Sequence, residues 1–193
     1  MQELKDRIVK EGKVLPGNII KVDGFLNHRI DTELMDHIAE EFGKHFNMDE
    51  VSLILTAEAS GIALAAICAQ HFHKPMLYAK KAKSDNIEGG LYQSDIFSYT
   101  YKKKVTLLVS KEWISSEDKV LIVDDFMANG EAMRGLCDIV TAAGATLVGI
   151  GCAVEKGYQG GGDRLRAAGY HLKSLAIIES AEPGNIVFRD DED

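Results

Sequence analysis

Residues 120–132, VLIVDDFMANGEA, constrain the fold of this chain more than any other stretch. Four apolar residues run into two adjacent acids, Asp124 and Asp125, and a turn of small residues then leads into a helical pattern. In open parallel sheets ligands bind beyond the carboxyl ends of the strands, and the pattern places both acids at such an end. The N-terminus of the following helix offers unpaired N–H groups to phosphate, and Gly130 can adopt a positive φ angle. The segment therefore predicts a site in which the two acids bind hydroxyl groups or a metal ion, next to a pocket for a phosphate.

A simpler interpretation of this segment is an ordinary strand–loop–helix turn with capping acids, because Asp and Asn are common turn residues. The pattern is more specific than a lone glycine-rich loop, however. It is not a nucleotide P-loop, since no lysine follows the glycine. A sugar phosphate carries both groups that the segment could bind, namely hydroxyls and a phosphate.

The remaining sequence alternates strands and helices, which predicts an α/β fold: a central, mostly parallel sheet flanked by helices on both faces. Residues 81–104 are polar and are expected to form either a hairpin or a mobile flap. The expected strands cover residues 52–56, 75–80, 105–110, 119–123, 145–154, 172–179 and 185–188, and the expected helices cover 1–13, 31–46, 62–72, 131–143 and 163–168.

Length and composition narrow the class of protein. A chain of 193 residues with 46% hydrophobic residues is expected to form one domain. An excess of acids over bases, 30 to 22, argues against nucleic-acid binding. No apolar run is long enough to span a membrane, and the charged N-terminus lacks the apolar centre of a signal peptide. Cys68, Cys137 and Cys152 stand in apolar contexts, so we expect buried free thiols in a reducing cytoplasm. The histidines show no zinc spacing.

Six stretches together resemble the type I phosphoribosyltransferases over nearly the whole chain, and within that family the branch that acts on xanthine. They are KVDGFLNHRID, TAEASGIALA, YAKK, SYTYKKK, VLIVDDFMANGEA and GIGCAVEKGYQGG. The resemblance implies transfer of a ribosyl 5-phosphate from 5-phosphoribosyl 1-pyrophosphate (PRPP) to a purine, with Mg²⁺ held mainly by PRPP. It also implies a homodimer and one domain over residues 1–193. The core of that domain would cover about residues 31–180, and a base-binding hood would combine about residues 1–30 with the C-terminal segment.

The donor site follows from the same resemblance. The resemblance assigns PRPP-binding roles to Ala59, Ser60, Gly61, Ser98, Tyr99, Ala128, Asn129, Gly130, Glu131 and Ala132. Asp124 and Asp125 would face the ribose hydroxyls, and Lys81 would stabilise the charge that gathers on the leaving pyrophosphate. Strand alternation would turn Lys80 the other way. The loop at 59–61 has a second interpretation as a helix capped by Ser60 without any ligand.

The base site rests on four residues. Lys156 is a donor only and therefore favours a 6-oxopurine over adenine, and Phe126 is placed to stack on the purine. A solvated lysine and a core phenylalanine are the alternatives. The resemblance implies that Ile20 and Asn27 contact xanthine.

Ala128 departs from the hypoxanthine–guanine branch of the family, which carries an aspartate at this position. That aspartate can take the purine proton, and this loop offers no such base. We therefore expect the purine to enter already partly anionic, as the relatively acidic xanthine can.

The expected activity is purine salvage, in which xanthine and PRPP give xanthosine 5′-phosphate (XMP) and diphosphate. Transfer to guanine, hypoxanthine or adenine is the alternative within enzymes. A non-catalytic regulator that senses PRPP is the alternative outside them. Such regulators add an N-terminal DNA-binding domain, whereas here one short helix precedes the hood and the net charge is acidic.

Overall fold

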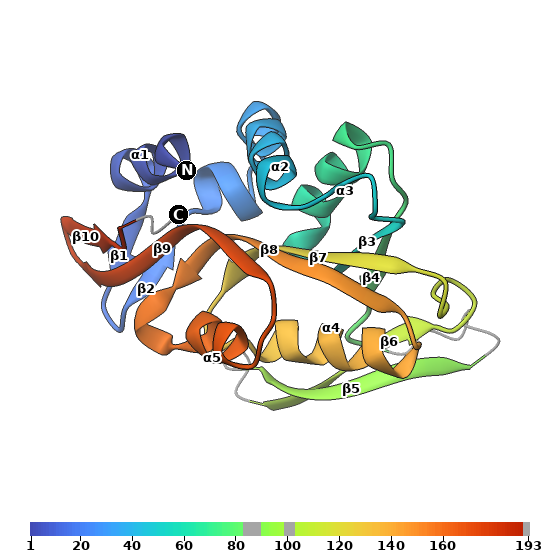
Figure 1. Cartoon of the computed structure of the whole chain (residues 1–193). Coiled ribbons are helices and arrows are strands. Elements are labelled where there is room, and N and C mark those ends of the chain that lie inside the picture. Colours follow the sequence, from blue (N-terminus) through green and yellow to red (C-terminus); the bar gives the residue numbers. More distant parts are fainter. Residues whose placement is uncertain (83–89, 99–102, 191–193) are drawn as a thin grey trace.

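A six-stranded sheet forms the centre of the computed structural model, which describes residues 1–82, 90–98 and 103–190 (Figure 1). The strands lie in the order β10-β9-β8-β7-β3-β4, and all neighbours are parallel except β10, which is antiparallel to β9. Their bounds are β3 Leu53–Ala57, β4 Met76–Ala79, β7 Lys119–Met127, β8 Thr146–Lys156, β9 Leu172–Glu182 and β10 Asn185–Phe188. The expected fold class is confirmed.

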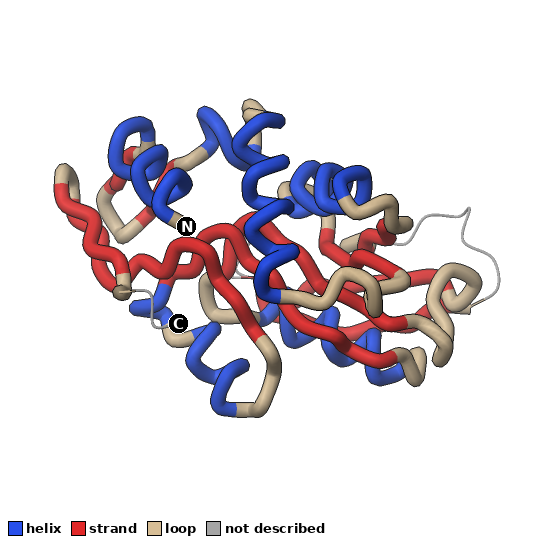
Figure 2. The backbone as a smooth tube through the Cα atoms, turned by 45° about the horizontal axis from the view of Figure 1, so that its top comes forward, coloured by secondary structure: helices blue, strands red, loops and turns tan. Residues whose placement is uncertain are grey.

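Helices cover both faces of this sheet (Figures 1 and 2). One face carries α1 Gln2–Glu11, α2 Thr32–His45 and α3 Gly61–His71, and the other carries α4 Glu131–Ala142 and the short α5 Gly161–Ala167. Within β3, Ile54 packs into the cluster under α2 and α3, whereas Leu53 and Leu55 pack into the cluster over α4. Because the centre of the sheet is buried on both faces, its central strands β3, β7 and β8 contain long apolar runs.

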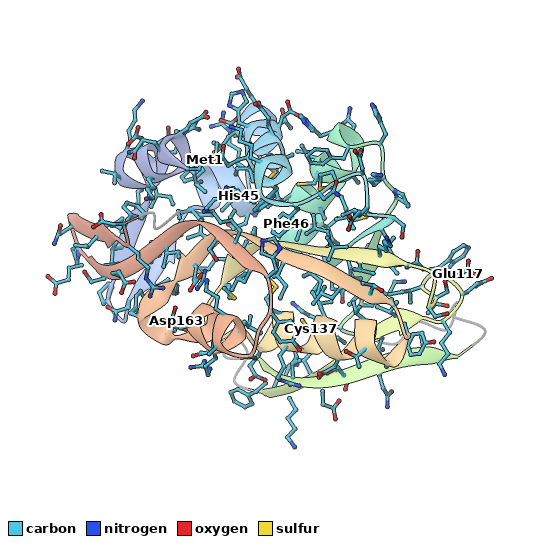
Figure 3. The ribbon with its side chains drawn as sticks, viewed as in Figure 1. Met1, His45, Phe46, Glu117, Cys137 and Asp163 are labelled. Atoms are coloured by element: carbon cyan, nitrogen blue, oxygen red, sulfur yellow. The ribbon has the colours of Figure 1, made fainter. Side chains whose placement is uncertain are left out.

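Large side chains of the covering helices pack against glycines of the sheet. Phe46, at the end of α2, is buried against β8, and a Cβ atom at Gly149 would lie only 2.4 Å from its ring (Figure 3). Cys137 lies on the opposite face, on α4 (Figure 3). Cys68, Cys137 and Cys152 are all free and buried, as expected.

The N-terminal segment builds a hood-like unit that the sequence did not resolve into elements. Strands β1 Lys13–Leu15 and β2 Ile19–Lys21 form an antiparallel hairpin, and a π-helical turn, η1 Asp23–Asn27, follows it. Gly17 and Asn18 make the hairpin turn with positive φ angles of 84° and 59°. The division of the chain into hood and core remains a prediction.

A second hairpin, β5 Leu91–Ser98 with β6 Lys103–Ser110, packs against α4 (Figure 1). It agrees with the hairpin alternative for residues 81–104, although residues 83–89 and 99–102 lie outside the described part of the chain. Within the described residues no helix is long and apolar enough to cross a membrane.

Local signals set several element ends as expected. Asp31 caps α2 through a hydrogen bond from the Leu34 N–H (3.2 Å), and Gly144 follows α4 with a φ angle of 71°.

The end of β7 differs from the expected boundary. β7 does not end at Val123 but continues to Met127, because β8 pairs with it as far as Glu155. The two acids are therefore part of the strand end and are held by the sheet.

Candidate active site

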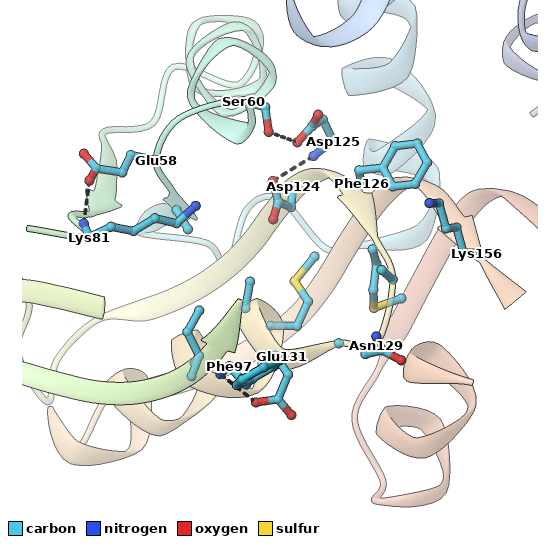
Figure 4. A pocket seen from close by; sticks show the side chains of 17 residues that line it. Glu58, Ser60, Lys81, Phe97, Asp124, Asp125, Phe126, Asn129, Glu131 and Lys156 are labelled. Carbon is cyan, nitrogen blue, oxygen red and sulfur yellow. Dashed lines mark hydrogen bonds between the residues drawn. The ribbon is translucent and has the colours of Figure 1, made fainter. Parts of the chain in front are cut away.

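A pocket of about 300 Å³ opens where the strand order reverses direction, between the carboxyl ends of β3 and β7 (Figure 4). From β3 the chain moves through α3 to β4 at one edge, and from β7 it moves through α4 to β8 on the other side. Ligands of open α/β sheets bind at such a switch point. The pocket is lined by Ala57, Glu58, Ser60, Lys81, Ile96, Phe97, Asp124, Asp125, Phe126, Met127, Ala128, Asn129, Gly130, Glu131, Ala132, Met133 and Lys156.

The acid pair forms the floor of this pocket. Asp124 is 8% exposed and Asp125 is 1% exposed, and the Asp125 N–H donates to Asp124 Oδ1 at 3.0 Å. Burial and the neighbouring carboxylate of Asp125 raise the pKa of Asp124 well above its usual range. Gly61 makes room for this carboxylate, since a Cβ atom there would lie 2.3 Å from Asp124 Oδ1.

The loop after β3 is tied to the second acid. Ser60 does not cap α3; its hydroxyl donates instead to Asp125 Oδ1 at 2.8 Å (Figure 4). The Glu58–Ala59 peptide bond is cis. Ser60 lines the pocket, whereas the predicted loop residues Ala59 and Gly61 flank it without lining it. Two buried oxygens near this loop, Thr56 Oγ1 and Asp125 Oδ2, have no hydrogen-bond partner among the described residues.

Lys81 supplies a cation on the same side of the pocket. Its backbone N–H donates to Glu58 Oε1 at 2.5 Å, and its side chain extends toward Asp124 (Figure 4). Lys80 does not line the pocket; its backbone pairs with Leu108 of β6 instead. The basic side chain expected at the end of this strand therefore lines the same pocket as the acid pair.

The loop after β7 has the geometry of an anion pocket. Gly130 adopts a φ angle of 76° immediately before α4, which only glycine does readily. All five predicted residues, Ala128, Asn129, Gly130, Glu131 and Ala132, line the pocket. The Glu131 carboxylate accepts a hydrogen bond from the Phe97 N–H at 3.3 Å, which connects this loop to the β5–β6 hairpin.

Lys156 and Phe126 line the end of the pocket that lies away from Lys81 (Figure 4). Lys156, the last residue of β8, holds its Nζ atom 5.4 Å from the centre of the Phe126 ring and 3.4 Å from the Asn18 carbonyl, to which it donates. Burial lowers the pKa of Lys156. The Tyr158 hydroxyl donates to the same carbonyl at 3.1 Å, so β8 and the hood meet here.

Four of the predicted site residues, Ala59, Gly61, Ile20 and Asn27, do not line the pocket. Ile20 is buried in the hood and packs in the core, and Asn27 is half-buried at the end of η1. The side chain of Ser98, at the end of β5, and the whole of Tyr99 lie outside the described residues.

Sequence reasoning missed several lining residues, and in most cases no local signal marks them. Ile96 and Phe97 come from the hairpin, whose docking on α4 cannot be read from its own pattern. Glu58 lines the pocket as well, and the signal that could have indicated it is a polar residue between a strand and a helix.

The chain is similar to known proteins over nearly its whole length. The phosphoribosyl transferase domain family matches residues 25–174. A xanthine phosphoribosyltransferase of Bifidobacterium adolescentis is 50% identical to this chain, over 98% of the chain and 100% of the relative. One of Lachnoclostridium phytofermentans is 51% identical over the full length of both proteins. This chain belongs to the phosphoribosyltransferase family. The family resemblance that the six sequence stretches predict is thereby confirmed.

Solved structures of phosphoribosyltransferases share the fold. The adenine phosphoribosyltransferase of Giardia lamblia, solved with 9-deazaadenine, aligns with a TM-score of 0.75 at 19% identity, over 92% of this chain and 98% of that one. The enzyme of Thermoanaerobacter pseudethanolicus aligns with a TM-score of 0.64 at 22% identity, over 76% and 81%. At these identities the likeness concerns the phosphoribosyltransferase fold alone.

Proposed function

We propose that the protein is a purine-salvage enzyme that transfers the 5-phosphoribosyl group of PRPP to xanthine, forming XMP and diphosphate. One observation carries this proposal. A single pocket joins a buried acid pair, a phosphate-type loop at a helix N-terminus, and a donor-only lysine beside an aromatic ring. Half-identical relatives that bear the name xanthine phosphoribosyltransferase support it.

The donor would lie across the two loops. The N–H groups of residues 128–132 would bind the 5-phosphate, Asp124 and Asp125 would orient the ribose hydroxyls, and residues 59–61 would bind the pyrophosphate. As the bond from the anomeric carbon to pyrophosphate breaks, the leaving group takes the electron pair, and Lys81 would stabilise that charge. The cation-like sugar would then form its new bond to a purine nitrogen. Positioning and electrostatics would supply most of the rate.

The base would lie between Phe126 and the hood. The Lys156 ammonium would donate to the purine 6-carbonyl, and an amino group at that position would leave two donors facing each other. Asn27 and Ile20 would contact xanthine from the hood, and the Asn27 amide could donate to the 2-carbonyl that hypoxanthine lacks. This assignment requires the hood to approach the bound base.

Mg²⁺ fits this pocket as a partner of the donor. Within the described residues no group of three or more His, Cys, Asp or Glu side chains could hold a metal ion. Mg²⁺ is commonly bound by one or two carboxylates together with substrate phosphates and water, which matches an acid pair beside a pyrophosphate site. Asp124 and Asp125 are the residues that would contribute. When bound, the metal would neutralise pyrophosphate charge.

The proposal extends to assembly and location. We propose a homodimer in a reducing cytoplasm, because the family resemblance implies a dimer and three buried thiols remain unpaired. Sedimentation of the purified protein at several concentrations tests the dimer.

Product identification decides between the enzyme and its alternatives. The purified protein is incubated with PRPP, Mg²⁺ and each of xanthine, guanine, hypoxanthine and adenine, and the nucleotides are separated. XMP should accumulate fastest. A faster product from another purine would replace the proposed substrate, and no product from any purine would leave the PRPP-sensing regulator, which calorimetry with PRPP then tests.

A further inference from the structure

The segment that follows β8 contacts the phosphate-type loop from behind. We name residues 157–167 the connector; it contains the short 3-10 turn η2 Gly157–Gln159 and α5. The connector lines no part of the pocket. Two of its residues, Gly161 and Arg164, nevertheless touch the loop formed by residues 128–130.

Gly161 meets this loop backbone to backbone. A Cβ atom at Gly161 would lie 2.3 Å from the Ala128 carbonyl oxygen and 2.6 Å from both the Asn129 carbonyl carbon and the Gly130 nitrogen. Distances this short leave no space for any side chain. The loop therefore rests directly on the first turn of α5.

Arg164 holds the same loop by a hydrogen bond. Its Nη2 atom donates to the Asn129 carbonyl at 3.1 Å, and its Nη1 atom donates to the Gln159 carbonyl at 3.4 Å. In a planar trans peptide the carbonyl oxygen and the amide hydrogen point in opposite directions. Fixing the Asn129 carbonyl on the connector therefore aims the Gly130 N–H away from it, toward the pocket side of the loop.

A buried ion pair fixes the connector itself. The Glu155 carboxylate is fully buried and accepts hydrogen bonds from Arg166 Nη2 at 2.8 Å and Nη1 at 3.1 Å, and it also accepts one from the Ser174 hydroxyl. Gly162 leaves room for this carboxylate, because a Cβ atom there would lie 2.1 Å from Glu155 Oε1. A two-pronged pairing of guanidinium and carboxylate fixes direction as well as distance.

We infer that Arg164 and Gly161 are positioning residues for the donor's 5-phosphate. They set the direction of the amide groups in the loop at 128–130 without touching the donor. This inference rests on the proposed function, in which that loop binds the phosphate of PRPP.

The variant Arg164→Met tests this role. Loss of a charge-assisted hydrogen bond to the loop should raise KM for PRPP about tenfold, while kcat and KM for xanthine change less than about threefold. Arg164→Lys should restore most of the affinity, because an ammonium can still donate to the Asn129 carbonyl. Calorimetry with ribose 5-phosphate should show the same order of affinities without any turnover.

Arg189→Met is the matched control. Arg189 also contacts α5, donating to Asp163 Oδ1 at 2.7 Å, but its side-chain hydrogen bonds within the described residues go to Asp163 and Glu179 and not to the loop. If α5 acted only through its stability, both variants would weaken PRPP binding alike. We expect Arg189→Met to leave KM for PRPP within twofold of the wild-type value.

Gly161→Ala provides an independent variant that removes no charge. The added methyl group must displace the loop, so KM for PRPP should again rise while KM for xanthine stays. The inference is overturned if both Arg164→Met and Gly161→Ala keep the wild-type KM for PRPP, or if Arg189→Met matches Arg164→Met. A wild-type protein that forms no nucleotide but binds ribose 5-phosphate in an Arg164-dependent way would sink the proposed function alone.

Discussion

At the scale of single residues, Asp124 shows how a functional group can cost stability. Its carboxyl is buried beside Asp125, and both effects raise its pKa in the folded protein. A carboxyl with a raised folded pKa contributes stability below its unfolded pKa and loses that contribution as the pH rises through the folded pKa. At higher pH, the ionised Asp124 therefore weakens the free protein.

The first prediction concerns Asp124→Asn. At slightly alkaline pH this variant should unfold with a free energy about 1 kcal/mol higher than the wild type, because an uncharged amide avoids the burial cost. The gain should shrink in acid, where the wild-type carboxyl is protonated. Transfer should fall about a hundredfold, since the ribose loses an ionised partner.

Chemical denaturation at two pH values and initial rates measure both effects of this substitution. Asp49→Asn is the control, because Asp49 is an exposed acid in the turn before β3. An Asp124→Asn protein that is no more stable than the wild type at alkaline pH would contradict this account.

The second prediction concerns Lys156, whose burial beside Phe126 lowers its pKa. Lys156→Met should reduce kcat/KM for xanthine about 10- to 100-fold, the range expected for one hydrogen bond from a charged donor. The variant should lose its preference for oxopurines over adenine. Lys119→Met is the control, since Lys119 is an exposed lysine at the other end of the sheet, on β7. Equal losses of kcat/KM for xanthine and for adenine would argue that Lys156 only supports the pocket wall.

The sequence could predict the residues that stand in continuous motifs. The role of residues 124–132 can be predicted because the strand, the acids and the helix start are adjacent in the chain. The pairing of Ser60 with Asp125 joins residues 65 positions apart, and that of Glu155 with Ser174 joins residues 19 apart. Such pairs depend on the strand order, which no local pattern fixes.

At the scale of elements, α4 connects the phosphate-type loop to the β5–β6 hairpin. Arg134 donates to the Asp95 carbonyl at 2.7 Å, and the Ser94 hydroxyl donates to Asp138 at 2.8 Å. Gly135 allows the close approach, because a Cβ atom there would lie 2.5 Å from Ile96 Cγ2 and 3.0 Å from Leu107 Cδ1. The hairpin thus reaches the pocket with Ile96 and Phe97 by resting on this helix.

The third prediction follows from that contact. Gly135→Ala improves the intrinsic helix propensity of α4, but its methyl group collides with a buried branched side chain. The collision should dominate and lower the free energy of unfolding by about 1–2 kcal/mol. Thermal unfolding measures the change. Gly24→Ala is the control, because an added Cβ atom there would have no atom within 4 Å. A Gly135→Ala protein as stable as the wild type would show that the hairpin can move aside without lowering the free energy of unfolding.

Elements of the core were predictable, whereas in the hood only the helix α1 was. Strands β3, β7 and β8 are buried on both faces, so uninterrupted apolar runs mark them. Strands β1 and β2 have three residues each and are mostly exposed, so they carry no periodic signal. Their pairing and the turn η1 depend on packing against α1 and the sheet.

At the scale of the whole molecule, the fold places the pocket at the reversal of strand order, but the loop at 128–132 offers no residue for one chemical task. A purine loses a proton when its ring nitrogen bonds to the sugar. The loop at 128–132 has Ala128 where a carboxylate could have accepted that proton, and Glu131 turns its carboxylate to the Phe97 N–H. We therefore expect the purine to bring its own negative charge.

The fourth prediction is the pH dependence that this arrangement imposes. kcat/KM for xanthine should fall steeply as the pH drops below the ionisation of free xanthine, because only the anion reacts without a base. Protonation of Asp124 would also lower the rate in acid, since its pKa is raised. A xanthine analogue made more acidic by an electron-withdrawing substituent separates the two causes. If the substrate's charge controls the rate, the acid limb moves to lower pH by the difference between the two ionisations. If an enzyme group controls it, the limb stays where it was.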